Sequence, residues 1–309
     1  MISPILVQGV EKKFGAVKAL NEISFSVDED ELFGLIGADG SGKTTLFRIL
    51  TSLLIPDSGS ATVLGFDVVK DYKQIRRSVG YMPGRFSLYQ DLTVQENLEF
   101  FATIFGTSIN ENYELIREIY SQIEPFKNRK AGKLSGGMKQ KLALSCALIH
   151  APKVLFLDEP TTGVDPVSRK EFWEMLKRLK EKGITIMVST PYMDEASLCD
   201  RVALIQQGRI LSINTPEEIA KQFSKPLFAL SSPNKFKLIQ DLRAYEFAEN
   251  VFPFGENVHY SDQRNIPADE IQRDLSSFLS RKKHADVSVQ QISPTIEDVF
   301  MKLMKQEAA

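Results

Sequence analysis

The chain has 309 residues, enough for about two domains, and 43% of them are hydrophobic, so it can bury a sizeable core. Its 38 basic and 40 acidic side chains leave a net charge of −2, which excludes the strongly basic composition usual in nucleic-acid-binding proteins, and we expect no nucleic-acid partner. No stretch reaches about 18 consecutive apolar residues, and the first thirteen residues lack a signal-peptide layout. We therefore expect a soluble polypeptide, with any membrane role supplied by a separate subunit.

The first third of the chain predicts mainly strands. Residues 32–36 form a short apolar run typical of a buried parallel strand, and residues 45–50 predict the helix that follows it. The other strands predicted in this part are 5–10, 23–27, 60–64 and 78–82.

From about residue 91 to residue 149 the apolar pattern is helical. Strands and helices then alternate, which predicts a parallel sheet with a helical insertion. The elements expected here are strand 154–157, helix 166–182, strand 184–189, helix 193–198 and strand 202–205.

Turn-forming residues follow residue 222, and we expect a small α/β domain from about 225 to 309. Its last apolar stripe comprises Ile296, Val299, Phe300 and Leu303, spaced as on one face of a docking helix. The basic run 281–284 predicts a solvated helix end. The three histidines lack the spacing of metal ligands. We expect Cys146 and Cys199 to be buried free thiols of a protein in a reducing compartment.

The most informative motif follows the strand at 32–36. It matches G-x-x-x-x-G-K-T, in which glycines let backbone amides surround phosphate oxygens, a lysine adds positive charge and a threonine hydroxyl ligates Mg²⁺. The alternative is a chance match in a glycine-rich turn, but the flanking strand and helix favour a phosphate site. The residues expected to bind nucleotide here are Gly37, Asp39, Gly40, Ser41, Gly42, Lys43, Thr44 and Thr45.

A second pattern is the apolar run 154–157 that leads directly into Asp158 and Glu159. A buried strand ending in two carboxylates places them at the carboxyl edge of a parallel sheet, where ligands bind in such folds. Asp158 suits Mg²⁺ ligation together with Thr44, and Glu159 suits the general base that polarises an attacking water. The alternative is a strand that simply reaches solvent.

A third pattern is Ser135, Gly136 and Gly137, which precede the helical run 139–148. A serine and two glycines before a helix form a second anion-binding site. A plain capped helix start would look the same, because serine is a favoured N-cap residue, and the two explanations are compatible.

Together these motifs resemble the ATP-binding cassette (ABC) family over roughly residues 1 to 225. The phosphate loop, residues 134–138 and residues 154–159 match the first nucleotide motif, the signature motif and the second nucleotide motif. The resemblance implies a P-loop NTPase fold: an α/β parallel-sheet core with an antiparallel β subdomain and a helical subdomain at about 85–150. The cassette would span residues 1–224.

The resemblance also implies that two cassettes, identical or different, dimerise head to tail. ATP and Mg²⁺ would then lie between the phosphate loop of one cassette and the signature motif of the other. Asp165 lies in the segment that signals across the dimer, and Phe14 would stack on adenine, although an aromatic residue near a strand often belongs to the core.

Two positions depart from the family pattern. The family usually has a glutamine where this chain has Gly84, and a histidine where it has Pro191. Glycine has no side chain, and proline offers neither a side-chain donor nor an N–H. Either backbone or water substitutes for the missing groups, or this site binds ATP but hydrolyses it slowly; we favour the second explanation.

The function expected is the ATPase subunit of a bacterial drug-export-like ABC transporter, peripheral on the cytoplasmic face of the membrane and driving a separate permease subunit. The resemblance implies that residues 86–89 and the helical segment to Phe105 receive a coupling helix of that subunit, although we expect most of Phe100, Phe101 and Phe105 to pack in the core. Residues 293–300 resemble the C-terminal segment of drug-export cassettes. The alternatives are a non-transport cassette acting as a soluble switch or assembly factor, and a metabolite kinase, which leaves the signature motif unexplained.

Overall fold

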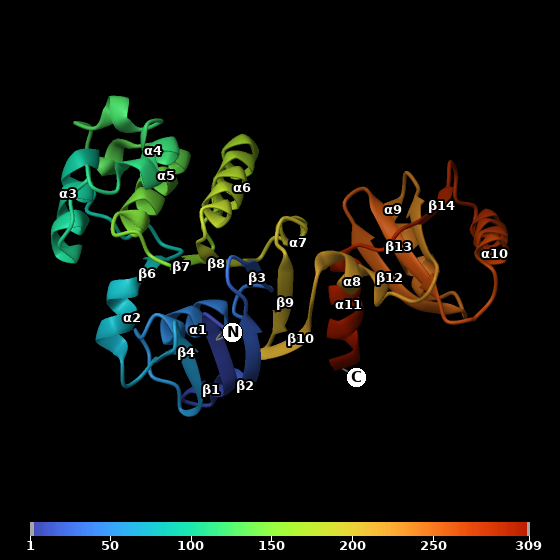
Figure 1. Ribbon diagram of the computed structural model, residues 1–309. Helices are drawn as coiled ribbons and strands as arrows, with labels where there is room; N and C mark the ends of the chain where they lie inside the picture. The colour runs from blue at the N-terminus through green and yellow to red at the C-terminus, as the bar shows by residue number, and fades with distance from the viewer. Residues whose placement is uncertain (1–2, 308–309) are drawn as a thin grey trace. The chain divides into compact units, whose positions relative to one another are not determined.

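The computed structural model describes residues 3–307, which divide into two compact units, Met1–Pro216 and Glu217–Ala309. Figure 1 follows the chain from the first unit, in blue to yellow, to the second, in orange to red. The predicted domain boundary at residue 224 lies in the connection between α8 (Pro216–Lys221) and β11 (Leu227–Ser231).

The first unit is organised around a six-stranded sheet with the order β10-β9-β3-β8-β7-β6. The strands from β9 to β6 pair in parallel, and β10 adds an antiparallel edge. The predicted parallel sheet is confirmed. Its strands are β3 (Leu32–Ile36), β6 (Val79–Met82), β7 (Val154–Asp158), β8 (Thr185–Thr190), β9 (Arg201–Gln206) and β10 (Arg209–Asn214).

A second, antiparallel sheet has the order β2-β1-β4-β5. The first hairpin turns at Gly15, whose φ of +58° is left-handed, and both of its strands extend beyond the predicted ranges. The strands of this sheet are β1 (Ile5–Phe14), β2 (Val17–Val27), β4 (Ser58–Val63) and β5 (Phe66–Asp67).

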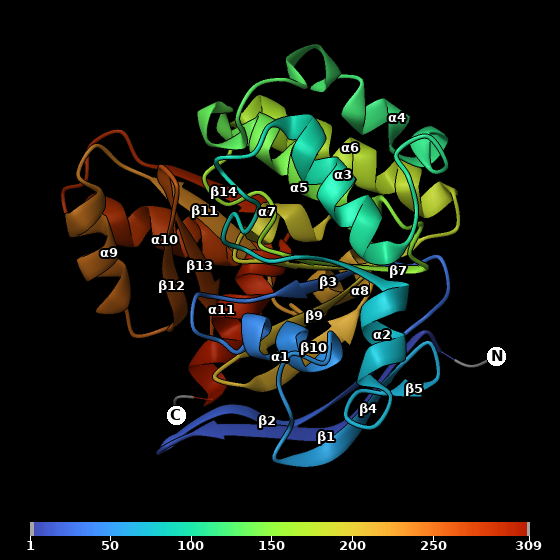
Figure 2. The same cartoon turned by 90° about the vertical axis from the view of Figure 1, so that its left-hand side faces the viewer.

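Helix α1 (Lys43–Leu50) lies between the two sheets, as Figure 2 shows. Leu46, Phe47, Ile49 and Leu50 are fully buried in one apolar cluster that joins both sheets. Burial of each such side chain stabilises the fold by roughly 1.5–3 kcal/mol, so the start of α1 and the loop before it are held firmly.

The opposite face of the large sheet carries α5 (Gly136–Leu148), α6 (Pro166–Glu181) and α7 (Met193–Ala196) (Figure 2). Asp165 caps α6 and Gly183 follows its end with a φ of +82°, as predicted. Helices α3 (Val94–Phe105) and α4 (Tyr113–Tyr120) complete the helical insertion with α5, and α2 (Tyr72–Ser78) precedes β6.

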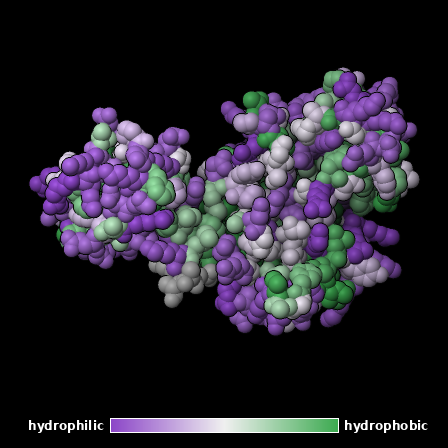
Figure 3. All heavy atoms as spheres, turned by 180° about the vertical axis from the view of Figure 1, so that it is seen from behind, coloured by the Kyte–Doolittle hydropathy of each residue, from purple (hydrophilic) through white to green (hydrophobic). Residues whose placement is uncertain are grey.

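The second unit has the order β-α-β-β-α-β of a split βαβ fold, and its antiparallel sheet runs β12-β13-β11-β14. Phe228, Leu230, Val258 and Tyr260 of the sheet pack with the apolar faces of its helices. The remaining elements are α9 (Lys235–Arg243), β12 (Ala248–Phe254), β13 (Asn257–Asp262), α10 (Ala268–Arg281), β14 (Ser288–Ile292) and α11 (Ile296–Glu307). Figure 3 shows that the face of this unit in view is mainly hydrophilic.

Helix α11 is tied to this sheet by a buried polar contact. Asp298 Oδ1 lies 2.6 Å from His259 Nδ1, and both side chains are at most 6% exposed. Ile296, Val299 and Phe300 of the predicted stripe are also buried.

The prediction that residues 281–284 form a solvated helix end is wrong for His284. Its side chain is 1% exposed, and Nε2 lies 2.9 Å from Asp241 Oδ2. The chain turns back after α10 and carries the ring against α9, which the run of charges does not reveal. Among residues 3–307, no helix combines the length and the apolar character needed to span a membrane.

Candidate functional site

The predicted phosphate loop joins β3 to α1 and is glycine-dependent at several points. Gly40 and Gly42 have φ values of +77° and +109°, which L side chains rarely adopt. A Cβ atom on Gly37 would lie 2.2 Å from the carbonyl oxygen of Ile205, and one on Gly42 would lie 2.5 Å from that of Ala19. The loop therefore requires glycine for its backbone shape and its close packing.

Two buried polar side chains stand at this loop. Lys43 is 3% exposed, and its Nζ donates to the carbonyl oxygens of Gly37 (2.8 Å) and Ala38 (3.0 Å). The same Nζ lies 3.2 Å from Glu159 Oε1. Ser41 is also 3% exposed, and its Oγ has no hydrogen-bond partner within residues 3–307. A buried hydroxyl without a partner is unfavourable, so this loop suits a ligand with acceptor oxygens.

Asp158 is the last residue of β7, and Glu159 follows it. In the parallel sheet β8 lies between β7 and β3, so the two carboxylates and the phosphate loop lie at the carboxyl ends of neighbouring strands. Asp158 is 2% exposed, and its Oδ1 accepts a 2.6 Å hydrogen bond from Ser189 Oγ. Glu159 has a left-handed φ of +51°, a strained conformation for this residue type. The sequence alone assigned no role to Ser189. The signal available was a polar residue near the end of an apolar strand that follows the strand of Asp158.

Gly84, the first departure from the family pattern, lies directly against the backbone of Asp158. A Cβ atom there would approach the carbonyl oxygen of Asp158 to 2.9 Å, which real Cβ atoms essentially never do. A side chain at position 84 therefore requires the backbone to shift. The nearby side chain of Tyr81 is also affected by Asp158: burial, and to a smaller extent the charge of Asp158, raise the pKa of Tyr81 to about 12.

Pro191, the second departure, sits in a turn held by a buried network. Thr190 Oγ1 donates to Glu195 Oε2 and accepts a 3.1 Å hydrogen bond from the amide of Tyr192. Glu195 is 2% exposed and pairs with Arg169 of α6 at 3.0 Å. This network, which sequence reasoning missed, connects the turn to the helix that follows the family's dimer-signalling segment.

The signature residues lie at the exposed start of α5. Ser135 is its N-cap and accepts a 3.3 Å hydrogen bond from the amide of Met138. Gly136 opens the helix, and a Cβ atom on Gly137 would lie 2.9 Å from Ser168 Oγ. A side chain at position 137 would therefore displace the Ser168 side chain at the start of α6.

Asp165 caps α6 through Oδ1, which accepts from the amides of Val167 (3.1 Å) and Ser168 (3.0 Å). Hydrogen bonds lower the pKa of the Asp165 carboxyl group, and those from Ser168 have the largest effect. Within residues 3–307, no hydrogen bond or ion pair joins the signature residues to the phosphate loop. The signature residues and the phosphate loop therefore form two separate groups in the described part of the chain.

The remaining predicted nucleotide residues lie in β1, in the loop and at the start of α1. Phe14 ends β1 and is 51% exposed. Asp39 is exposed, and Thr44 and Thr45 are half-buried in the first turn of α1.

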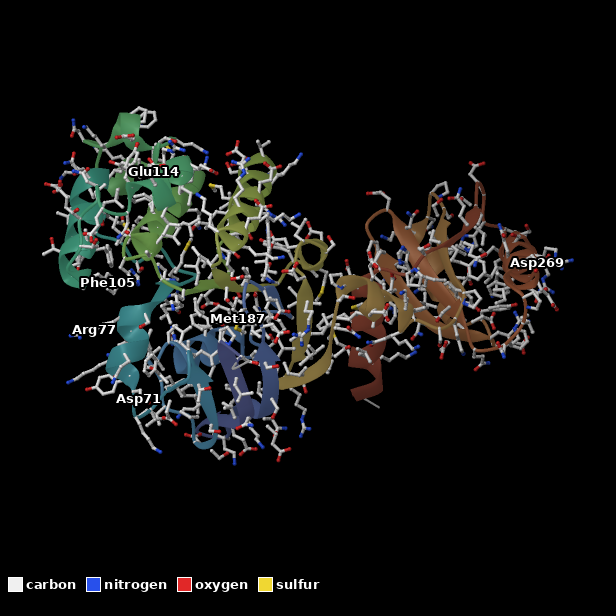
Figure 4. The ribbon with its side chains drawn as sticks, in the orientation of Figure 1. Asp71, Arg77, Phe105, Glu114, Met187 and Asp269 are labelled. Carbon is white, nitrogen blue, oxygen red and sulfur yellow. The ribbon has the colours of Figure 1, made fainter. Side chains whose placement is uncertain are left out.

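An apolar groove of about 180 Å³ lies between the helical insertion and the rest of the first unit. Figure 4 shows Phe105 at the end of α3 near Arg77 of α2. The Phe105 ring stacks on His150 with centroids 3.8 Å apart, and burial lowers the pKa of His150. The side chains that define the groove include Arg76, Met82, Pro83, Phe86, Leu88, Phe101, Phe105, Gln140 and His150.

The expectation that most of the three α3 phenylalanines lie in the core is wrong. Phe101 and Phe105 line the groove, and Phe100 is 37% exposed beside Tyr89. Helical periodicity gives the apolar face of α3 but not whether another element covers it.

Comparison with known proteins agrees with this geometry. A family profile described as ABC transporter matches residues 20–162. The Nod factor export ATP-binding protein I of Burkholderia lata is 35% identical over 312 residues, covering 99% of this chain and 98% of that protein. The chain belongs to the ABC transporter family.

Further relatives of this ABC protein differ in length. The probable multidrug ABC transporter ATP-binding protein YbhF of Escherichia coli is 38% identical over 312 residues, which cover 97% of this chain. The chain spans only 52% of that relative's length.

Solved cassettes share the fold. The ATP-binding subunit of an ABC transporter is 28% identical with a TM-score of 0.65, covering 72% of this chain and 93% of that one. A dimeric cassette in a post-hydrolysis state, bound to ADP and Pi, is 26% identical with a TM-score of 0.62 and covers 68% and 98%. The predicted P-loop NTPase fold is confirmed.

The residues of this ABC protein fit a magnesium nucleotide. Within residues 3–307 the Ser41 hydroxyl has no partner, so it and the buried Lys43 cation could donate to phosphate oxygens, and the glycines allow backbone amides to turn toward them. Thr44 and Asp158 carry the hard oxygen atoms that Mg²⁺ prefers.

Proposed function

We propose that the chain is the ATP-binding subunit of an exporter and uses ATP binding and hydrolysis to drive a separate membrane subunit. The observation that carries this proposal is the contact between Lys43 and Glu159, which joins the phosphate loop to the acidic end of β7. A phosphate-binding cation beside a candidate general base is the arrangement that phosphoryl transfer to water requires.

In this account Lys43 and Ser41 bind phosphate oxygens of ATP, and Phe14 stacks on the adenine ring. Bound Mg²⁺, held by Thr44 and Asp158, would neutralise charge developing on the phosphates. Glu159 accepts the proton of the attacking water, a role usually worth about 10²–10⁴ in rate.

We further propose that the site is completed by a second cassette, identical or different. Ser135, Gly136 and Gly137 lie at an exposed helix start, where backbone amides and the helix dipole favour an anion. Among residues 3–307 no bond joins these residues to the chain's own phosphate loop, and we propose ATP bound to the partner cassette as their ligand. Asp165, at the start of the adjacent helix, would carry the signal between sites.

Hydrolysis at this chain's own site is proposed to be slow. Gly84 supplies no side chain next to Asp158, and the close approach of its backbone leaves no space for one. Pro191 supplies neither an imidazole nor an N–H to the γ-phosphate. Glu159 remains, so the proposal is reduced turnover rather than complete loss.

The apolar groove is the proposed docking site of the membrane subunit. It lies between the proposed helical subdomain (85–150) and the rest of the first unit, and its lining includes Phe86, Phe101 and Phe105. Exposed apolar surface of this kind marks an interaction site. Relatives over nearly the full chain are named as export ATP-binding proteins, which supports a peripheral location on the cytoplasmic face of the membrane. Residues 1–224 would be the cassette, and residues 225–309 an accessory domain.

The competing function is a soluble ABC switch or assembly factor. Purification from native membranes, followed by ATPase measurement on the purified complex, separates the two. We expect a membrane protein with several spans in a fixed ratio to the chain, and ATP hydrolysis that depends on Glu159. Co-purification with ribosomes and no membrane protein would contradict the exporter.

A further inference from the structure

Ser189, the fifth residue of β8, contacts both acidic residues that end β7. It is fully buried and pairs in register with Asp158 across the parallel strands. Its Oγ donates a 2.6 Å hydrogen bond to Asp158 Oδ1 and accepts a 3.0 Å hydrogen bond from the amide of Glu159. A carboxylate can only accept and an amide can only donate, so the chemistry fixes the direction of both bonds.

The backbone of Glu159 needs such support. Its φ of +51° lies in a region that residues other than glycine occupy only when their surroundings hold them there. The amide of Glu159 also donates to the carbonyl oxygen of Ser189 at 3.0 Å, so two atoms of one residue fix this peptide. The held peptide places Glu159 Oε1 3.2 Å from Lys43 Nζ.

We propose that Ser189 is a positioning residue for ATP hydrolysis, an inference that rests on the proposed function. Through its hydroxyl it orients Asp158 and stabilises the backbone conformation that directs Glu159 toward the phosphate loop. Reacting groups must be held closely, and a displacement of about 1 Å can reduce a rate about 10²-fold. Gly84 and Pro191 contribute no side-chain donor, whereas the Ser189 hydroxyl links the Asp158 carboxylate to the backbone amide of Glu159.

The test compares Ser189→Ala with Ser145→Ala in the full chain. Ser145 is equally buried, and its hydroxyl donates to the carbonyl oxygen of Lys141 in the same helix. We expect Ser189→Ala to lower kcat by about ten- to a hundredfold relative to Ser145→Ala, because a hydrogen bond to a charged group is lost. The Kd for ATP without Mg²⁺ should change less than twofold, because the phosphate loop is intact.

Amide hydrogen exchange measures the stability of the Glu159 backbone conformation and does not depend on ATP hydrolysis. The amide of Glu159 should exchange at least tenfold faster in Ser189→Ala than in Ser145→Ala, whereas amides of α1 should exchange equally in both. Ser189→Thr keeps the hydroxyl, and it should restore slow exchange and most of kcat; this variant also serves if the alanine variant fails to fold.

Equal kcat in the two alanine variants, or a loss of kcat matched by an equal loss of ATP affinity, would overturn the role of Ser189. So would unchanged exchange at Glu159. Failure of the proposed function looks different: wild type and Ser145→Ala would both lack ATP hydrolysis, while the exchange comparison would still report on Ser189.

Discussion

Lys43 Nζ lies 3.2 Å from Glu159 Oε1, so the lysine proposed to bind phosphate and the proposed general base form a direct ion pair. Lys43 is almost fully buried, whereas the Glu159 side chain is 23% exposed. An attraction between unit charges at such a distance is substantial near a protein surface. Binding of phosphate would offer Lys43 other oxygen atoms and release Glu159 to accept a proton, which couples binding to catalysis.

Replacing Glu159 with glutamine should separate binding from hydrolysis. The amide keeps the size of the side chain but cannot accept the proton of the attacking water, so turnover should fall by about 10²–10⁴. Binding of a fluorescent ATP analogue should stay within a few-fold of wild type. Glu171→Gln, on the surface of α6, is the control and should retain both properties. A variant at position 159 that hydrolyses ATP at the normal rate would exclude Glu159 as the base.

Replacing Pro191 with histidine should accelerate hydrolysis. A side-chain donor near the γ-phosphate is typically worth at least tenfold in rate, and the wild-type residue provides none. The measurement is steady-state ATPase activity of the purified chain, with Pro233→His, in the turn before α9, as control. Gly84→Gln is a poorer test because its Cβ atom would collide with Asp158. High wild-type activity that Pro191→His leaves unchanged would remove the argument for a slow site.

Replacing Phe101 with aspartate should prevent docking of the membrane subunit. A carboxylate in an apolar groove loses hydration without gaining a partner, so affinity should fall at least tenfold. The measurement is the amount of membrane subunit retained by the tagged chain. Ile104→Asp is the matched control, because Ile104 lies on the same helix, is 59% exposed and does not line the groove. Equal losses in the two variants would show that the groove is not the docking site.

Replacing Asp298 with asparagine should destabilise the second unit at neutral pH by about 1.5–3 kcal/mol, the usual value of a hydrogen bond to a charged group. Although burial opposes the shift, hydrogen bonds from His259 and Thr295 hold the pKa of Asp298 below its ordinary value of 3.8. A lowered pKa in the folded state means that this stabilisation is present above about pH 4 and is lost as the pH falls further.

Urea unfolding of wild type and Asp298→Asn from pH 7 to pH 3 measures this effect. The difference in unfolding free energy should stay constant down to about pH 4 and then shrink. Asp269→Asn, at an exposed position on α10, should show almost no difference. A difference in unfolding free energy that grows on acidification would contradict the role given to the ionised Asp298 side chain.

The fold was predictable because its signals are local. The apolar run 32–36, the glycine spacing after it and the Asp165 N-cap each define structure within a few residues, and the alternation of strands and helices indicates a parallel sheet. The strand and helix limits differ from prediction by a few residues. Lys43, for example, already lies in α1, because backbone hydrogen bonding begins within the motif.

The contacts between distant segments were not predictable. Ser189 meets Asp158 across 31 positions of the sequence, and Arg169 meets Glu195 across 26. Strand register sets the first of these contacts and helix packing the second, and neither leaves a periodic pattern in a single sequence. For the same reason, the exposed position of Phe100 and the buried position of His284 required the structure.

The most direct test of ATP binding at the phosphate loop is calorimetric titration of the purified chain with ATP, comparing wild type with Lys43→Ala. We predict saturable binding of one ATP per chain, weakened about ten- to a hundredfold in the variant, because the buried cation contributes charge-assisted hydrogen bonds to phosphate. Absence of binding by the folded wild type, or equal affinity in the two proteins, would contradict the account.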